Sequence, residues 1–242
     1  MPYLITIIIY IFAQNIAFSA PIKDFTAHYD LYYNGFYVGK STRSLITQNN
    51  LATFSSIAKT AGMAAWFADI TVTEASKLRY ENDKLNFVSY LYDEKGNNKN
   101  EKYELHLDKS RRLYNSHEKK FYPPTTNLHD TLGFTVAIML DMQAGKRNIK
   151  YTIAEKDNFK PYTLKFIKKE ALMTDKGEIN TLKMEHYDPE TKYRFTFWCA
   201  ENMGFLPIKI SNINPKGDEN SLHLTHFNNN PVHLSLDEEE IE

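Results

Sequence analysis

Cysteine is almost absent from the chain, and its scarcity excludes several kinds of site. Cys199 is the single cysteine among 242 residues. The chain therefore cannot form an internal disulfide, a four-thiolate zinc site or a paired-cysteine redox centre. Cys199 follows the strand-forming residues Phe197 and Trp198, which predicts a buried position within a strand.

An excess of charge of one sign is also lacking. The chain has 29 basic and 30 acidic side chains, with a net charge of −1. A nucleic-acid-binding protein uses excess positive charge to neutralise phosphates, so we do not expect nucleic acid as a partner. The sequence also has no glycine-rich phosphate loop, no GxSxG nucleophile elbow and no dinucleotide fingerprint.

Long apolar runs are limited to the N-terminus. Residues 4–13 are almost wholly apolar, but a membrane span needs about 20 such residues. A run of this length is typical of a secretory signal peptide. The small residues Ala17 and Ser19 predict cleavage near Ser19 or Ala20, and hence a signal peptide over residues 1–19 and a periplasmic location. A retained N-terminal anchor is the alternative, because no Lys or Arg lies near the first residue.

Aromatic residues are abundant and lie in alternating patterns. The chain has 16 Tyr and 15 Phe. Phe25, Ala27 and Tyr29 alternate with polar residues, and this period of two indicates a strand with one buried face. Turn signals such as Asn34-Gly35 separate about eleven to thirteen segments of this kind.

One convincing helix is predicted over Asn127 to Gly145. Either Asn127 or Asp130 could cap it, because their side-chain oxygens accept the free amides of a first turn. Apolar residues then recur at helical spacing, at Leu132, Val136 and Met139. The stretch from Ala61 to Ala68 is interpreted as a short helix or ordered loop.

These elements predict a fold class and one large domain. One-sided antiparallel strands tend to curl or close, since sheet twist accumulates and open edges invite aggregation. We therefore expect a mainly β protein: an antiparallel, strongly curled or partly open β-barrel with one principal α-helix. The single β-rich domain is expected over residues 20–228, and a disordered acidic tail over 229–242.

Three groups of segments resemble a known family. They are Tyr32–Gly39 with its tyrosines and two glycines, Asp130–Leu132 opening the helix, and Phe197–Ala200 followed by Phe205–Ile210. In this order they resemble the bacterial exported family called domain of unknown function 3108. The segment 84–108 departs from the family pattern, because it lacks a proline around positions 86–88.

The resemblance implies a periplasmic, partly open β-barrel, similar to the sheets that carry lipoproteins and lipids between membranes. It implies no catalytic residues. No residue pair in the sequence predicts catalysis or metal binding either. We interpret His129-Asp130 as a helix cap, and the pairs Asp69/Glu74 and Glu101/Glu104 as solvated strand residues. His223 and His226 lie three apart on a strand, and such side chains point to opposite faces.

The aromatic excess supports the leading hypothesis. We expect a cavity inside the curled sheet that holds an apolar or amphipathic ligand such as an envelope lipid. The candidate ligand-binding residues are Trp66, Phe67, Tyr90, Tyr92, Phe197, Trp198 and Phe205. Plain core packing is the alternative for these rings, and the helix could plug the concave face. We expect no enzymatic activity, cofactor, metal or membrane span in the mature chain. A structural or interaction protein of the envelope is the second hypothesis, and an enzyme acting on envelope glycans or lipids is the third.

Overall fold

The protein forms one continuous curled sheet of fifteen strands. The computed structural model describes residues 22–81, 84–97, 100–175 and 177–234. The predicted signal peptide, over residues 1–19, lies outside these ranges. The strands are ordered β8-β7-β6-β5-β4-β3-β2-β1-β15-β14-β13-β12-β11-β10-β9. Sequential hairpins thus run outward in both directions from the central β1–β15 pair, as expected for a chain with turn signals between alternating segments.

The first half of the chain supplies eight strands. They are β1 Phe25–Tyr33, β2 Phe36–Gln48, β3 Leu51–Thr60, β4 Ile70–Glu81, β5 Lys84–Gly96, β6 Asn100–Leu107, β7 Leu113–Asn115 and β8 Lys120–Tyr122. The second half supplies the others. They are β9 Leu128–Asp130, β10 Asn148–Ala154, β11 Phe159–Thr174, β12 Gly177–Tyr187, β13 Arg194–Ala200, β14 Leu206–Ile213 and β15 Glu219–Asn228. Only the β9–β10 pair is parallel among the described strands.

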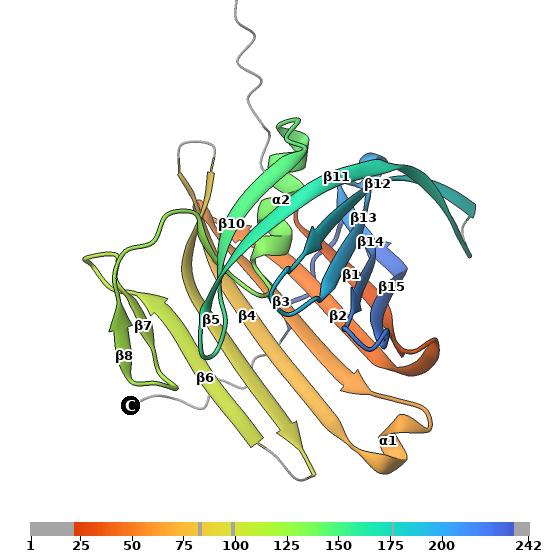
Figure 1. The fold of residues 1–242 in the computed structure, drawn as a ribbon, viewed down its shortest axis with the longest axis horizontal. Helices are drawn as coiled ribbons and strands as arrows, with labels where there is room; N and C mark the ends of the chain where they lie inside the picture. The colour runs from red at the N-terminus through yellow and green to blue at the C-terminus, as the bar shows by residue number, and fades with distance from the viewer. Residues whose placement is uncertain (1–21, 82–83, 98–99, 176, 235–242) are drawn as a thin grey trace, which may run out of the picture.

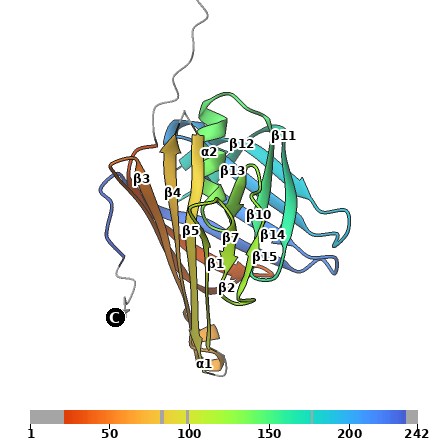
Figure 2. The ribbon, with the colours of Figure 1, turned by 90° about the vertical axis from the view of Figure 1, so that its left-hand side faces the viewer.

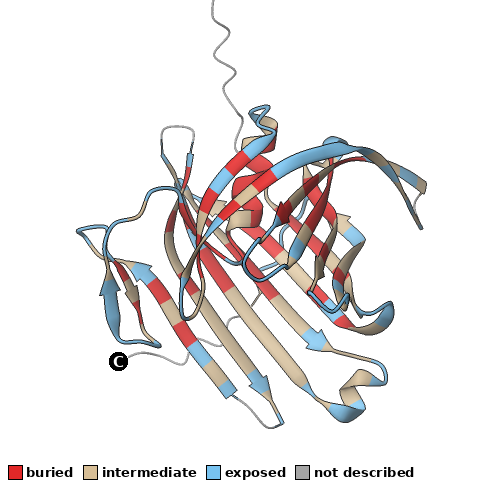
Figure 3. Ribbon diagram, viewed as in Figure 1, coloured by how far each residue is buried: buried red, intermediate tan, exposed pale blue. Residues whose placement is uncertain are grey.

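The sheet curls around the helix α2, Phe134–Gln143 (Figures 1 and 2). Seven of its ten residues are buried, and they pack in two directions. Val136 and Met139 belong to a core cluster with strands of the first half, and Ile138 and Met142 belong to a cluster with β10–β13. A helix that is apolar all round must be enclosed. Buried positions accordingly lie where the strands pass the helix (Figure 3).

The β7–β8 end of the sheet meets the β10–β11 hairpin without a backbone ladder between the described strands. In the seam, Asn115 Nδ2 donates to the Lys156 carbonyl at 2.7 Å, and the rings of Tyr122 and Phe159 lie 4.7 Å apart. His117 Nε2 lies 3.4 Å from the Asp157 carboxylate. The barrel is therefore partly open, closed by side-chain contacts. The expected fold class, a curled antiparallel sheet with one principal helix, is confirmed.

The predicted start of the helix is wrong. The helix begins at Phe134, not at Asn127, because residues 128–130 form the edge strand β9. Asn127 has a left-handed backbone (φ 53°), and its carbonyl accepts the Thr152 amide at 3.0 Å. Pairing with β10 therefore outweighs the local helical signal. Asp130 does cap the turn before the helix: its Oδ1 accepts the amide of Gly133 at 2.7 Å.

The short helix and the tail are placed as follows. Helix α1, Ala64–Phe67, lies within the predicted 61–68 segment. Residues 229–234 of the predicted tail lie within the described ranges, and the Val232 amide donates to Thr26 Oγ1 at 2.8 Å. The remainder of the predicted acidic tail, residues 235–242, lies outside the described ranges.

Candidate ligand pocket

An aromatic pocket opens beside α2, against the second half of the sheet. Its volume is about 480 Å³, within the range of small-molecule sites. Helix α2, the turn before it, β10–β13 and the β12–β13 turn form its walls. The lining residues are Thr131, Phe134, Ile153, Glu155, Lys160, Pro161, Tyr162, His186, Asp188, Pro189, Glu190, Thr191, Tyr193 and Phe195.

Aromatic rings make the apolar wall of this pocket. Tyr162 stacks on His186 with ring centroids 3.7 Å apart. Phe134 of α2 meets Tyr162 edge-on at 5.5 Å, and Phe195 lies 5.8 Å from Tyr162 on the other side. Tyr193 extends the wall, 6.3 Å from Phe195. The rings come from four elements, so only the curled sheet brings them together.

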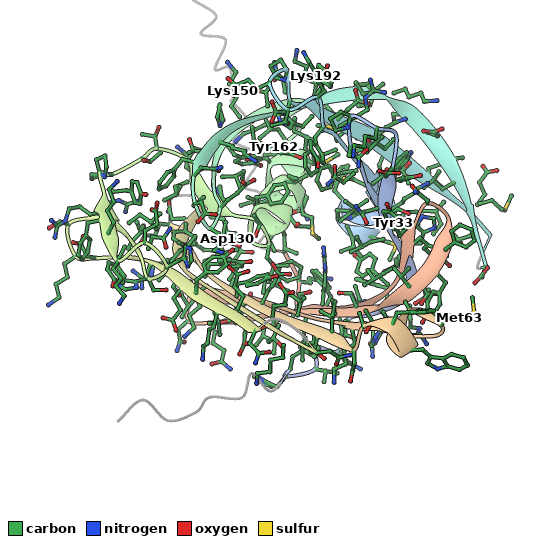
Figure 4. All side chains as sticks on the ribbon, turned by 60° about the horizontal axis from the view of Figure 1, so that its bottom comes forward. Tyr33, Met63, Asp130, Lys150, Tyr162 and Lys192 are labelled. Atoms are coloured by element: carbon green, nitrogen blue, oxygen red, sulfur yellow. The ribbon has the colours of Figure 1, made fainter. Side chains whose placement is uncertain are left out.

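The Tyr162 hydroxyl is a buried polar group without a hydrogen-bond partner in the described structure. Tyr162 is 8% exposed and lies between α2 and β11 (Figure 4). Burial raises the pKa of Tyr162 well above its usual value, with a further contribution from Glu155. The phenol is therefore neutral and able to donate. An unpaired buried hydroxyl costs about 1–3 kcal/mol, which a ligand with an acceptor atom could recover.

The rim of the pocket is mostly acidic. Glu155 and Lys160 form an ion pair at 2.8 Å, while Asp188 and Glu190 add carboxylates from the β12–β13 turn. Burial lowers the pKa of His186, partly opposed by the Thr163 backbone and Asp188. The imidazole is thus neutral at physiological pH, so the pocket floor is uncharged and its rim is negative. This arrangement suits a neutral or cationic head group on an apolar body.

A chain of polar contacts leads from the pocket into the core. Thr131 Oγ1 donates to the Tyr90 hydroxyl at 3.1 Å, and that hydroxyl donates to Glu74 Oε1 at 2.6 Å. Beside it, Ser76 Oγ donates to Asp130 Oδ2 at 2.5 Å. These contacts fix the turn that carries Thr131 and Phe134, and so hold one wall of the pocket in place.

A second hollow lies on the other side of α2. Its volume is about 520 Å³, and its lining is more polar than that of the aromatic pocket. Lys84, Arg111 and Lys146 lie at it, together with His129. The nearby Asp141 is engaged by Lys146 and by the Tyr151 hydroxyl. Among the described residues that line the hollow, Asp141 is the only carboxylate, and this pairing occupies it.

The structure separates the seven aromatic residues predicted for the site. Trp66 and Phe67 are 86% and 87% exposed, at α1. Tyr90 and Tyr92 lie on β5 and both contact Tyr103. None of the seven lines the aromatic pocket.

The other three predicted residues lie on or beside β13 and β14, in three different environments. Phe197 is buried behind the pocket, with its ring centroid 5.7 Å from that of Phe134. Trp198 points to the opposite face of β13, where its indole donates to Glu170 at 2.9 Å. Phe205 packs beneath the Arg147 guanidinium. Of the predicted residues, Phe197 contacts the pocket residue Phe134 and Tyr90 contacts the pocket residue Thr131.

Sequence reasoning missed Phe134, Tyr162 and Phe195. One signal could have found Phe195, which lies two residues before Phe197 and so shares its face of the strand. No local signal places Phe134 or Tyr162 beside it. Within the described ranges, no cluster of three or more His, Cys, Asp or Glu could hold a metal ion. The described helices are all too short or too polar to cross a bilayer.

Among the comparisons with known proteins, one solved structure with a TM-score above 0.5 supports the fold. The family model described as protein of unknown function (DUF3108) matches residues 28–224. A β-barrel-like protein from Brucella abortus, of domain of unknown function DUF1849, is similar with a TM-score of 0.56 and 11% identity, over 86% of this chain and 98% of that one. A DUF1089 family protein from Pseudomonas aeruginosa has a TM-score of 0.35 and 9% identity, over 69% and 86% of the two chains. No curated protein matches the chain.

Proposed function

The chain belongs to the DUF3108 family of proteins of unknown function, and from that premise we propose that it is a periplasmic, non-enzymatic binding or carrier protein. Its ligand is apolar or amphipathic, such as an envelope lipid. The observation that supports this proposal is the aromatic pocket with the unpartnered hydroxyl of Tyr162. Apolar walls around one convergent polar group are typical of small-molecule sites.

The helix does not fill the whole interior, and this bears on the carrier hypothesis. Helix α2 occupies the centre of the curl, yet a hollow remains on each side of it. The aromatic pocket is large enough for part of an acyl chain or for a ring system. The ligand body would contact Phe134 and Phe195, and an acceptor atom such as a carbonyl oxygen would meet Tyr162.

Binding should be lost when a charge is placed in the pocket wall. We expect Phe195→Arg to weaken binding of an apolar fluorescent probe, N-phenyl-1-naphthylamine, at least about tenfold, because the guanidinium must be desolvated as the probe enters. Fluorescence titration measures this. The matched control is Phe166→Arg, a strand aromatic on β11 that is 36% exposed and lies outside the pocket. Equal affinity of wild type and Phe195→Arg, or lipid-free wild type by native mass spectrometry, would contradict the proposal.

The hydroxyl of Tyr162 should matter only for ligands with an acceptor. We expect Tyr162→Phe to weaken binding of a long-chain ester about fivefold, which corresponds to one hydrogen bond of about 1 kcal/mol. Affinity for the alkane of equal length should not change. Isothermal titration calorimetry measures the affinity of each variant for the ester and for the alkane. A similar loss for ester and alkane would mean that the substitution disturbs packing and that the hydroxyl contacts no ligand.

A structural or interaction role in the envelope is the second candidate. The open seam favours it, since β8 is an edge strand with unpaired backbone groups and Phe121 on it is 47% exposed. An exposed edge can accept a strand from a partner. Crosslinking in cells distinguishes the two roles: a carrier yields lipid, and a scaffold yields one dominant protein.

A further inference from the structure

The tip of the β3–β4 hairpin presents large apolar side chains to solvent. Residues 61–68, which contain α1, carry no charged side chain. Met63 is 74% exposed, Trp66 86% and Phe67 87%. None of the α1 residues is buried. Single exposed apolar residues are ordinary, but three large ones on one short turn mark a contact surface.

The backbone holds this tip in a defined position. The Ala61 amide donates to the Val38 carbonyl at 3.0 Å, and Thr60 Oγ1 donates to the Ala68 carbonyl at 2.7 Å. The tip lies at the far end of the barrel from α2, as two perpendicular views agree (Figures 1 and 2). Met63 lies at the outer rim, away from the interior (Figure 4). The rings therefore take no part in the ligand pocket.

Lysines flank the tip on the outer face of the sheet. Lys40 lies directly opposite Lys59 in the β2–β3 ladder, and both are exposed. Like charges facing each other across strands destabilise a sheet. Neither lysine makes an ion pair within the described ranges. Lys95 lies in the same cross-strand row, 3.9 Å from Asp93.

Three aspartates, among them Asp93 beside Lys95, accompany these three lysines. Asp69 follows the uncharged segment, and Asp30 lies opposite Lys40 on β1. The outer face beside the tip carries charges of both signs, but Lys40 and Lys59 make no ion pair in the described part of the chain, and the uncharged aromatic tip projects beyond them. This order matches a membrane surface, where Trp side chains favour the headgroup level and lysines meet anionic lipids.

We propose that this hairpin tip docks on an anionic lipid bilayer. Trp66, Phe67 and Met63 enter the boundary between headgroups and acyl chains, and Lys40 and Lys59 contact lipid phosphates. The inference goes beyond the proposed ligand binding and does not depend on it, because no tip residue lines the pocket. Either can fail alone: tip variants leave the pocket unaltered, and pocket variants leave the tip unaltered.

The two tryptophans of the chain allow a direct test. Trp198→Phe leaves Trp66 as the sole tryptophan. With vesicles of phosphatidylglycerol and phosphatidylcholine, we expect its emission to shift to the blue and acrylamide quenching to fall. Phosphatidylcholine alone should give a smaller change, and added salt should reverse the lysine contribution. Unchanged emission with anionic vesicles overturns the proposal, as does a shift produced only by a purified protein partner.

Substitutions then separate the apolar and cationic contributions. In vesicle co-sedimentation, we expect Trp66→Ala with Phe67→Ala to abolish binding, and Lys40→Gln or Lys59→Gln to weaken it about fivefold each. Tyr187→Ala and Lys150→Gln are matched exposed controls away from the tip, and should bind as wild type. Probe binding in the pocket should persist in every tip variant. Equal losses in tip and control variants would refute specific docking.

Discussion

Gly133→Ala is expected to destabilise the protein by about 3 kcal/mol. Gly133 lies in the turn before α2, and its φ of −64° suits any residue. The cost is steric: a Cβ at this position would lie 2.2 Å from Ser76 Oγ and 2.7 Å from Asp130 Oδ2. Neither atom can move freely, because Ser76 donates to Asp130 and Asp130 accepts the amides of Leu132 and Gly133. Urea unfolding monitored by circular dichroism measures the loss.

A double variant identifies the cause. Ser76→Gly removes the closest atom, so Gly133→Ala should cost less in that background than in wild type. The difference between the two costs is the coupling energy of the clash. If Gly133→Ala cost the same in both backgrounds, contact with Ser76 would not be its origin. The aromatic pocket depends on this turn, so probe binding should weaken together with stability.

Asp130→Asn is expected to make stability strongly dependent on pH. Burial raises the pKa of Asp130 to about 6, although hydrogen bonds from Gly133, Ser76 and Leu132 oppose the shift. The folded protein therefore keeps this proton in the pH range where an unfolded aspartate, with a pKa near 3.8, loses it. The contribution of Asp130 to stability falls as the pH rises from about 4 to about 6. Two pKa units correspond to roughly 3 kcal/mol.

The neighbouring His129 has the opposite effect. Burial lowers the pKa of His129 to about 4, against a smaller effect of Asp141. The unfolded chain binds a proton more readily between about pH 4 and 6.5, so the contribution of His129 to stability rises with pH through that window. Its size is also about 3 kcal/mol. In wild type these two effects on stability nearly cancel. The contribution of Asp130 falls with pH over nearly the same range in which the contribution of His129 rises.

Each single substitution should expose the partner's slope. Relative to wild type, the unfolding free energy of Asp130→Asn should rise with pH between about 4 and 6.5, because the slope of His129 is no longer opposed by that of Asp130. Relative to wild type, that of His129→Gln should fall between about 4 and 6, because the slope of Asp130 is no longer opposed by that of His129. Urea unfolding at several pH values measures both against wild type. Parallel pH profiles for all three proteins would show that neither side chain titrates as its burial requires.

Much of the fold follows from the sequence for a local reason. Alternation such as Phe25, Ala27 and Tyr29 assigns one face of a strand to the core wherever the strand lies in the sheet. Most strands and the hairpin at Asn34-Gly35 were therefore predictable, whereas the segment 61–68 was predicted only as a short helix or an ordered loop. The aromatic content indicated large buried faces, and Cys199 is buried as predicted.

The candidate site required the tertiary structure. Phe134, Tyr162 and Phe195 lie in three segments far apart in the chain, and only the curvature of the sheet around α2 brings them together. The sequence reports that a ring is apolar but not whether it packs in the core, lines a hollow or faces solvent. Tyr90 and Trp66 carry equally strong local signals, yet one is 2% exposed and the other 86%. The alternation of side chains along each strand was thus determined by the sequence itself. The pocket and the exposed tip were decided by the tertiary structure, because long-range packing sets which other residues, or solvent, each strand face contacts.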